Sequence, residues 1–269
     1  MDTFFELFTY DFFQKAVLAA VFASISCGII GSYIVSRRIV FISGGITHAS
    51  FGGIGLAFLM GFNPLLGAVL FAVAAALGIQ FFTNVAEIRE DSSIAIWWSL
   101  GMALGIIFVF MTPGYTPNLM SYLFGNILTV TSSELWWMFL LNMLIIAFFS
   151  LFFRQILYIA FDEEFARTAG MPVQLFNYLT MILIALTVVL NIRVVGIILI
   201  LSLLTIPQAS ANLFTKDFRK LLVLSSVFAF IGTLLGLFIS YFMDIPSGAA
   251  IIFTLVLMFG ILRLFKSFF

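Results

Sequence analysis

The sequence predicts an all-α protein that crosses a membrane about nine times, and two observations support this prediction. Hydrophobic residues make up 63% of the 269-residue chain, whereas Asp, Glu, Lys and Arg together make up only 9%. A soluble domain has about 25% charged residues, so this chain has too few to cover a water-facing surface. The hydrophobic residues also fall in successive runs of about 20, the length that an α-helix needs to cross a bilayer.

Nine such runs follow one another along the chain, with turn or charge signals between them. They cover residues 14–35, 40–61, 64–86, 92–111, 133–153, 173–191, 194–213, 220–242 and 247–265. The break between the sixth and seventh runs is the least marked, because only a short stretch around Arg193 divides them. Eight spans are therefore an alternative. All the runs belong to one predicted transmembrane domain, residues 1–269.

The basic residues predict which side of the membrane each connection faces. Connections in the cytoplasm are rich in Lys and Arg. If nine spans begin outside the cell, only Lys15 and Arg193 of the 12 basic residues fall on the outer side. We therefore expect the N-terminus outside and the C-terminus inside.

One cytoplasmic connection, FDEEFARTAGMPVQ (161–174), predicts a short helix of its own. Asp162, Glu163 and Glu164 give it an acidic start, which is favourable at a helix N-terminus. Gly170 suits the C-terminal end, and Pro172 can begin the next helix. A short capped helix between two spans is a candidate docking element. The equally supported alternative is a connector that only contacts solvent.

The only histidine of the chain, His48, lies in the second run, within FISGGITHASFGGIGLAFLMG (41–61). An ionisable side chain at membrane depth is a functional candidate by default. Small residues let neighbouring helices approach closely in a membrane; those near the histidine include Gly44, Gly45, Gly52 and Gly53. The alternative is a packing histidine that hydrogen-bonds a backbone carbonyl or a hydroxyl such as Thr47 or Ser50. Residue type alone slightly favours that alternative.

The sequence lacks the motifs that several classes of protein require. The sequence has no G-x-x-x-x-G-K-[ST] loop for ATP, no C-x-x-C pair and no H-E-x-x-H motif. A net charge of zero without a basic block argues against nucleic acid as a partner. The acidic residues fall near connections, so the spans lack the carboxylates with which secondary carriers bind a coupling ion. We therefore expect a non-enzyme, in which any transport takes its energy from a cytoplasmic partner.

Six stretches, in order along nearly the whole chain, form a recognisable set. They are SGGITHASFGGIGLAF (43–58), EDSSIAIWWSLGMALGIIF (90–108), LMSYLFGNIL (119–128), DEEFARTAGMP (162–172), RVVGIILILSLLTIPQASA (193–211) and MDIPSGAAI (243–251). Each is weak alone, being apolar or glycine-rich. Together they make the chain resemble the membrane permeases of ATP-binding cassette (ABC) importers for zinc, manganese and iron(II).

The resemblance implies a permease of the vitamin B12-type (type II) fold that works as a homodimer in the cytoplasmic membrane of a prokaryote. Two cytoplasmic ATPase subunits would dock on the segment at about 161–172, and an external metal-binding protein would deliver the ion. The coupling residues so implied are Asp162, Glu163, Glu164, Ala166 and Gly170. In the family, the histidine that matches His48 lies on the translocation path near the dimer axis. Two chains would there supply two imidazoles to a transient metal site.

One position departs from the family pattern. Many members, the manganese ones especially, have an aspartate four residues before this histidine, where the present chain has Gly44. Manganese prefers oxygen ligands, whereas zinc readily accepts imidazole. The sequence therefore favours zinc as the transported ion, with manganese or iron(II) as alternatives.

The leading hypothesis is the permease subunit of an ATP-driven importer of divalent metal, with His48 on the ion path and no cofactor bound by the chain. The first alternative is a secondary carrier for a small neutral or cationic solute, which would keep transporting after ATP depletion. The second is a membrane scaffold that transports nothing. Mutations in the loop 162–170 would leave partner association and metal uptake of such a scaffold untouched.

Overall fold

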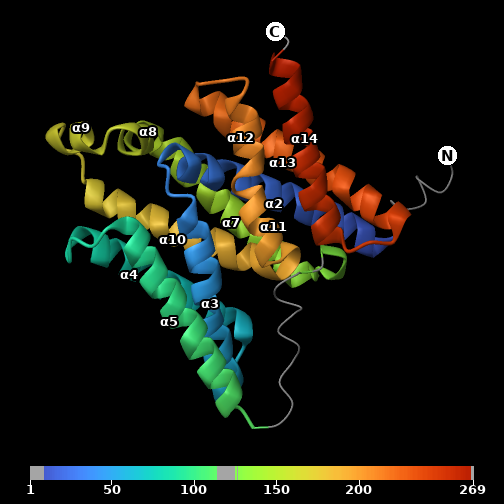
Figure 1. Ribbon diagram of the computed structural model, residues 1–269, viewed down its shortest axis with the longest axis horizontal. Coiled ribbons are helices and arrows are strands. Elements are labelled where there is room, and N and C mark those ends of the chain that lie inside the picture. Colours follow the sequence, from blue (N-terminus) through green and yellow to red (C-terminus); the bar gives the residue numbers. More distant parts are fainter. Residues whose placement is uncertain (1–8, 114–124, 126, 268–269) are drawn as a thin grey trace. The chain divides into compact units, whose positions relative to one another are not determined.

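The computed structural model describes residues 9–113, 125 and 127–267, which form helices joined by short connections (Figure 1). Among these residues, eight helices are long and apolar enough to cross a bilayer. They are α2 (Asp11–Ser36), α3 (Phe41–Met60), α4 (Pro64–Asn84), α5 (Glu90–Met111), α7 (Ser132–Leu151), α10 (Val173–Val195), α13 (Phe218–Met243) and α14 (Ser247–Ser267). The predicted all-α membrane fold is confirmed. Most of the stretch 119–128 lies outside the described residues.

The seventh predicted span, residues 194–213, is not one continuous helix. It forms two helices of seven residues each, α11 (Ile197–Leu203) and α12 (Ile206–Asn212). Pro207 explains the break, because proline lacks an N–H and its ring clashes with the carbonyl four residues earlier, at Leu203. The prediction of about nine apolar segments therefore resolves into eight continuous helices and one broken pair in the described chain.

The boundary before this broken pair also differs from the prediction. The turn expected around Arg193 is wrong, because α10 continues as a helix to Val195. The chain turns at Gly196 instead, where φ is +81°, a conformation that glycine adopts without steric cost.

Other boundaries follow local signals in the sequence. At the predicted break before α4, the Asn63 side chain accepts a hydrogen bond from the backbone N–H of Leu65 at 2.8 Å. Pro64 occupies the first turn, where its missing N–H costs nothing. The three shorter elements that complete the description are η1 (Ile127–Thr129), α8 (Phe153–Phe161) and α9 (Glu163–Thr168).

The helices belong to two compact units, each assembled from separate stretches of sequence. Unit 1 comprises Met1–Ser36, Met120–Phe148 and Asn191–Phe269, and so holds α2, the broken pair, α13 and α14. Unit 2 comprises Arg37–Leu119 and Phe149–Leu190, with α3, α4, α5, α8, α9 and most of α10.

Within unit 1, α2 packs closely against α13 and α12. Ser32 of α2 donates to the hydroxyl of Ser225 of α13 at 3.1 Å. The buried Gln208 side chain of α12 donates through Nε2 to the carbonyl oxygen of Cys27 at 2.8 Å. Such polar contacts between helices are the usual supplement to close packing where no water competes.

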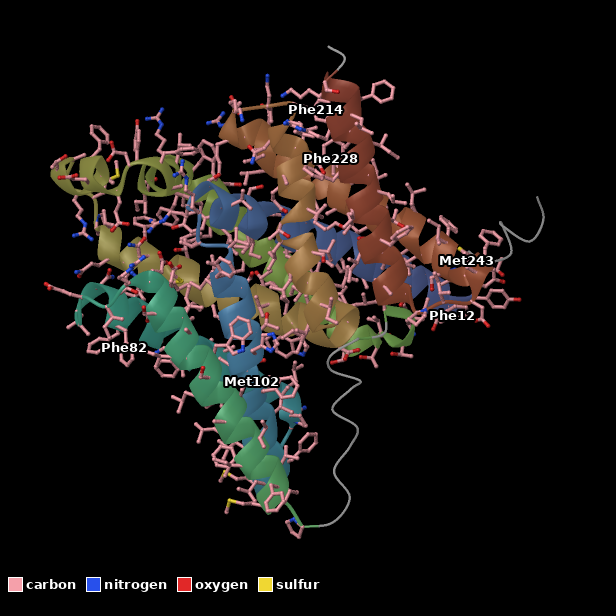
Figure 2. All side chains as sticks on the ribbon, in the orientation of Figure 1. Phe12, Phe82, Met102, Phe214, Phe228 and Met243 are labelled. Carbon is pink, nitrogen blue, oxygen red and sulfur yellow. The ribbon has the colours of Figure 1, made fainter. Side chains whose placement is uncertain are left out.

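Apolar side chains also cover outward surfaces of the helices. Figure 2 shows Phe12, Phe214 and Met243 projecting from the ribbon, with 42%, 53% and 65% of their surfaces exposed. Large exposed apolar surfaces are uncommon on soluble monomers. Their presence here fits a protein whose surroundings are lipid tails.

Candidate functional site

The predicted site residue His48 lies in α3, whose packing in unit 2 is set by glycines. Towards α4, the backbone of Gly53 touches that of Gly67 so closely that a Cβ at Gly53 would overlap the carbonyl group of Gly67. A Cβ at Gly52 would lie 2.8 Å from Cζ of Phe71. A side chain at Gly53 would therefore require the α4 backbone to shift, whereas one at Gly52 would require the Phe71 ring to move.

A second glycine-lined contact joins α3 to α5. A Cβ at Gly45 would lie 2.5 Å from Cγ2 of Ile94, and a Cβ at Gly101 would overlap the backbone of Ala49. Gly44 is buried in the same part of α3. Figure 1 shows α3, α4 and α5 packed side by side, and these contacts bring the backbone around His48 close to α5.

The His48 ring lies at the edge of the contact between α3 and α5. It is half-buried and stacks on Trp98 of α5, with ring centroids 4.4 Å apart and an interplanar angle of 7°. The stack covers one face of the imidazole. Neither ring nitrogen has a hydrogen-bond or ion-pair partner among the residues that the structure describes.

The hydroxyl groups beside His48 are engaged elsewhere. Thr47 donates to the carbonyl oxygen of Ser43 at 2.5 Å, and Ser50 donates to that of Thr47 at 2.6 Å. The hydrogen bonds that a purely structural histidine was expected to make with these hydroxyls are thus not formed in the described chain. The ring nitrogens therefore remain open to a group that the described residues do not supply.

One imidazole is the whole donor set that this part of the chain offers. Within residues 9–113, 125 and 127–267, no three His, Cys, Asp or Glu side chains group together in a way that could hold a metal ion. Gly44, one turn before His48, supplies no side-chain oxygen. A metal ion at His48 would need further ligands from a second chain or from water.

The predicted cytoplasmic helix is present as α9. The Asp162 side chain caps it by accepting a hydrogen bond from the backbone N–H of Phe165 at 2.9 Å. Gly170 follows the helix with φ of +77°, the left-handed conformation that favours glycine. Ala166 is completely buried, whereas Glu164 is exposed. The prediction of an acidic start and a glycine end is therefore confirmed for the secondary structure.

The exposed surface of α9 and its flanks is partly apolar. Phe161 and Phe165 are 61% and 50% exposed, and Phe165 packs edge-on against Tyr158 with ring centroids 5.6 Å apart. Exposed aromatic side chains next to charged ones are typical of surfaces that bind other proteins.

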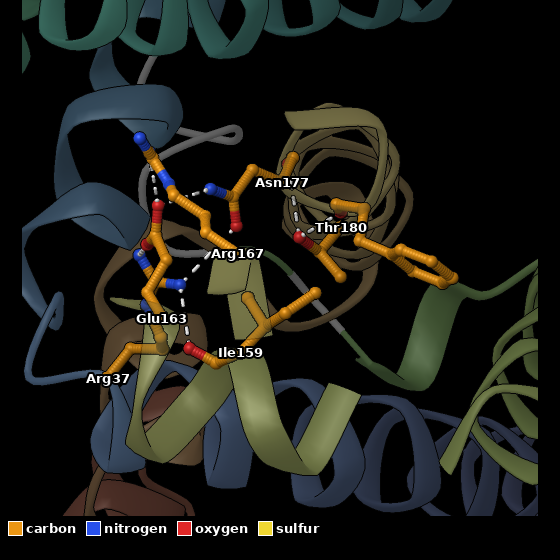
Figure 3. Close-up of polar contacts among 7 residues, drawn as sticks. Arg37, Ile159, Glu163, Arg167, Asn177 and Thr180 are labelled. Atoms are coloured by element: carbon orange, nitrogen blue, oxygen red, sulfur yellow. Dashed lines mark hydrogen bonds and ion pairs between the residues drawn. The ribbon is translucent and has the colours of Figure 1, made fainter. Parts of the chain in front are cut away.

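Glu163 lies at the centre of a polar network that Figure 3 shows. Its carboxylate pairs with the guanidinium groups of Arg37 at 2.9 Å and Arg167 at 2.8 Å. Arg37 also donates to the carbonyl oxygen of Ile159 at 3.1 Å and to Oδ1 of Asn177 at 3.3 Å. Asn177 in turn donates to Glu163 at 3.3 Å. The network fastens α9 to the end of α8, to α10 and to the connection before α3.

A comparison with known proteins identifies the family of this chain. The model of the ABC 3 transport family matches residues 9–266. The chain belongs to the ABC 3 transport family. Its resemblance to the permeases of metal importers is thereby confirmed, since a relative named as a manganese transport system membrane protein also matches nearly the whole chain.

Three matches illustrate this ABC 3 membership. The Synechocystis protein named uncharacterized membrane protein slr2045 is 42% identical over 253 residues, covering 94% of this chain and 90% of that protein. The manganese transport system membrane protein MntC of Listeria monocytogenes is 36% identical over 259 residues, covering 96% and 92%. The structure of PsaBC from Streptococcus pneumoniae in complex with Fab matches with a TM-score of 0.83 and 33% identity, covering 95% and 92%. The last match confirms the predicted permease fold.

Three residues of the two candidate sites in this ABC 3 protein were not predicted from the sequence. Trp98 was noticed only as part of an apolar stretch, although an aromatic residue beside a glycine-rich helix could have been considered as its neighbour. Arg37 is one of the ten basic residues that the topology prediction places on the cytoplasmic side, and Asn177 carries no motif. Arg37 joins Glu163 from a distant part of the sequence and Asn177 joins it from the following helix, and no local pattern indicates either pair.

Proposed function

We propose that this chain is the membrane permease subunit of an ATP-driven importer that carries divalent metal ions across the cytoplasmic membrane of a prokaryote. Membership of the ABC 3 transport family supports the transport class. The single structural observation that supports the metal site is the half-buried imidazole of His48, whose ring nitrogens have no partner in the described chain. His48 is the proposed contact for the ion along its path.

The proposed working unit is a homodimer. One imidazole makes a poor metal site, and a second copy of the chain would bring a second His48 to it, with water as the remaining ligands. Weak, transient binding suits a transport path, because an ion that binds tightly cannot leave. The packing role proposed for the glycines is to hold α3 against its neighbours and so to fix the position of the ring; they are Gly44, Gly45, Gly52 and Gly53.

Two observations about the transported metal point in different directions. The MntC relative carries manganese in its name, whereas the glycine at position 44 leaves His48 without a nearby carboxylate from its own helix. Imidazole alone suits zinc better than manganese. We keep zinc as the proposed ion on this chemical ground, and manganese is the outcome that the names of relatives favour.

The energy is proposed to come from two cytoplasmic ATPase subunits that dock on α9 and its flanks. Asp162 and Gly170 fix the two ends of the helix, the buried Ala166 seats it, and Glu164 with Phe165 offers an exposed surface. Glu163 joins it to the neighbouring elements. An external metal-binding protein is the proposed source of the ion.

The proposed topology places the N-terminus outside the cell and the C-terminus in the cytoplasm. The eight long helices and the broken pair α11 and α12 would then make nine crossings of a single permease domain, with α9 on the cytoplasmic side. The chain is proposed to hydrolyse no ATP itself, because its sequence has no Walker-type phosphate loop.

The test measures metal accumulation in a metal-starved bacterium that expresses the permease with its ATPase and binding protein. We expect uptake of zinc in preference to manganese, and loss of uptake when the phosphate-loop lysine of the ATPase is replaced. Manganese-selective uptake would reject the zinc proposal while keeping the importer. Uptake that survives the inactive ATPase, with ion gradients held, would instead support the secondary carrier.

A further inference from the structure

Arg37 occupies an unusual place for a basic residue at the end of a membrane span. It lies in the short connection between α2 and α3, yet its side chain is only 18% exposed. The guanidinium group contacts three elements at once: the carbonyl oxygen of Ile159 at the end of α8, Glu163 of α9 and Asn177 of α10. A charge that served only to set topology would be expected to remain in solvent.

The two cations that bind Glu163 differ in what they join. Arg167 lies one turn away on α9 itself, and its side chain is 55% exposed, so its pair with Glu163 stays within the helix. The Arg37 pair links α9 to a distant part of the sequence and is better shielded from water. Its planar guanidinium, with several donors in a fixed arrangement, makes this a directional attachment.

The other end of the attachment leads directly into α3. Ile39 is buried, and its carbonyl oxygen accepts from the N–H of Ile42 at 3.0 Å. The carbonyl oxygen of Val40 accepts from the N–H of Ser43 at 3.3 Å. The connection is thus tied into the first turn of α3, the helix that carries His48. A displacement of Glu163 would be passed through Arg37 to the start of that helix.

We propose that Arg37 is a positioning residue that couples α9 to α3, so that movement of the ATPase-docking helix is transmitted to the helix that holds the ion ligand. The inference rests on the proposed function, because it takes α9 as the docking element and His48 as the ion contact. It adds the mechanical connection between them. The attachment consists of the Arg37 guanidinium, the Glu163 carboxylate and the Asn177 amide.

The test uses the full permease–ATPase complex in liposomes, with ATP on the ATPase side, and measures metal transported per ATP hydrolysed. Arg37→Gln removes the charge at the attachment. Arg38→Gln is the matched control, because Arg38 is the next residue, is exposed and has no hydrogen-bond or ion-pair partner in the described chain. We expect R37Q to lower the metal-to-ATP ratio at least about fivefold, the lower end of typical coupling effects. R38Q should keep the wild-type ratio.

Two further variants separate coupling from folding. Arg37→Lys keeps the charge without the planar donors, and its ratio should lie between those of the wild type and R37Q. If Arg37 acts through Glu163, the double variant R37Q/E163Q should be no worse than the more impaired single variant, because the two changes remove the same interaction. Additive losses in the double variant would contradict the proposed pair.

Other results would also overturn the inference. A wild-type metal-to-ATP ratio in R37Q would show that the attachment transmits nothing. Loss of the assembled complex in both R37Q and R37K would show that Arg37 supports only folding or docking. Failure of the wild type itself to accumulate metal would contradict the proposed function, and this result is distinguishable because it appears without any substitution.

Discussion

Two regions of unit 2 place their polar groups in opposite ways. In α3, His48 is surrounded by glycine-mediated helix contacts and a tryptophan ring, and its nitrogens have no partner in the described chain. Around α9, Glu163 is bound by two guanidinium groups and an amide. The first region leaves the imidazole nitrogens without a partner among the described residues, whereas the second surrounds its central carboxylate with three donors.

The difference matches two different tasks. The transport site proposed at His48 must exchange its ligand, so its donor atoms should stay unoccupied by the protein, and close packing rather than hydrogen bonding holds the ring in place. The docking role proposed for α9 requires the helix to transmit movement, for which many directional contacts are useful. Substitutions in α3 should therefore act through packing and ring position, and substitutions around α9 through helix ends and ion pairs.

The largest effect is expected from Gly53→Ala. Its Cβ would overlap the backbone carbonyl of Gly67, and since backbone cannot rotate aside, the cost should be about 3 kcal/mol of stability. The counterpart beside α9 is Gly170→Ala, where a Cβ meets open space but φ is +77°, so the cost should be about 1 kcal/mol. The two variants are compared by their midpoints of thermal unfolding in detergent. Equal midpoints for the two variants would contradict the assigned α3–α4 packing.

A smaller effect, on transport rather than stability, is expected from Trp98→Ala. An aromatic stack is worth about 0.5–1.5 kcal/mol, so loss of ring orientation should lower metal uptake by up to about tenfold. Trp98→Phe, which retains a flat ring opposite His48, should keep more of the uptake. Wild-type uptake by the alanine variant, at equal membrane content, would show that the stack does not position the imidazole.

Loss of the cap of α9 should have a smaller effect than loss of the Trp98 ring. Asp162→Ala removes the acceptor for the N–H of Phe165, which is worth about 1 kcal/mol, whereas Asp162→Asn can still cap the helix. We expect the alanine variant to bind the ATPase about fivefold more weakly, given that 1.4 kcal/mol is a factor of ten. Binding of the purified permease to the ATPase measures this. Equal weakening by asparagine would show that the carboxylate charge matters and the cap does not.

The smallest effect is expected from Arg167→Gln. Arg167 and Glu163 lie four residues apart on one helix, and an exposed pair of this kind contributes about 0.3–0.5 kcal/mol to stability. The thermal midpoint should shift less than in Arg37→Gln, whose pair with the same carboxylate is better shielded. A larger shift of the thermal midpoint for R167Q than for R37Q would contradict the assignment of Arg37 as the residue that attaches α9 to the neighbouring elements.

Much of the fold was predictable because its signals are local. Runs of apolar residues predicted the long helices, and Asp162 and Gly170 predicted the ends of α9. Pro207 carried an equally local signal for the break between α11 and α12, but the apolar composition of residues 194–213 outweighed it in the prediction. The turn expected at Arg193 followed polarity, whereas the backbone turned at Gly196, the residue with the conformational freedom to do so.

The arrangement of the candidate sites was less predictable because it depends on contacts between distant residues. His48 stood out as the only histidine, but nothing in the sequence paired it with Trp98. Arg37 and Glu163 are far apart along the chain, and their partnership appears only once α8, α9 and α10 are packed. Composition can indicate which residue is a functional candidate, whereas the residues that it contacts become known only from the fold.

The most direct test of the account is metal accumulation by His48→Ala in metal-starved cells that also express the ATPase and the binding protein. Phe41→Ala is the matched control, since it removes an exposed ring about two turns earlier on the same face of α3. We predict that His48→Ala abolishes uptake while the variant still assembles with the ATPase, and that Phe41→Ala transports normally. Undiminished uptake by His48→Ala would make the histidine a packing residue and place the ion path elsewhere.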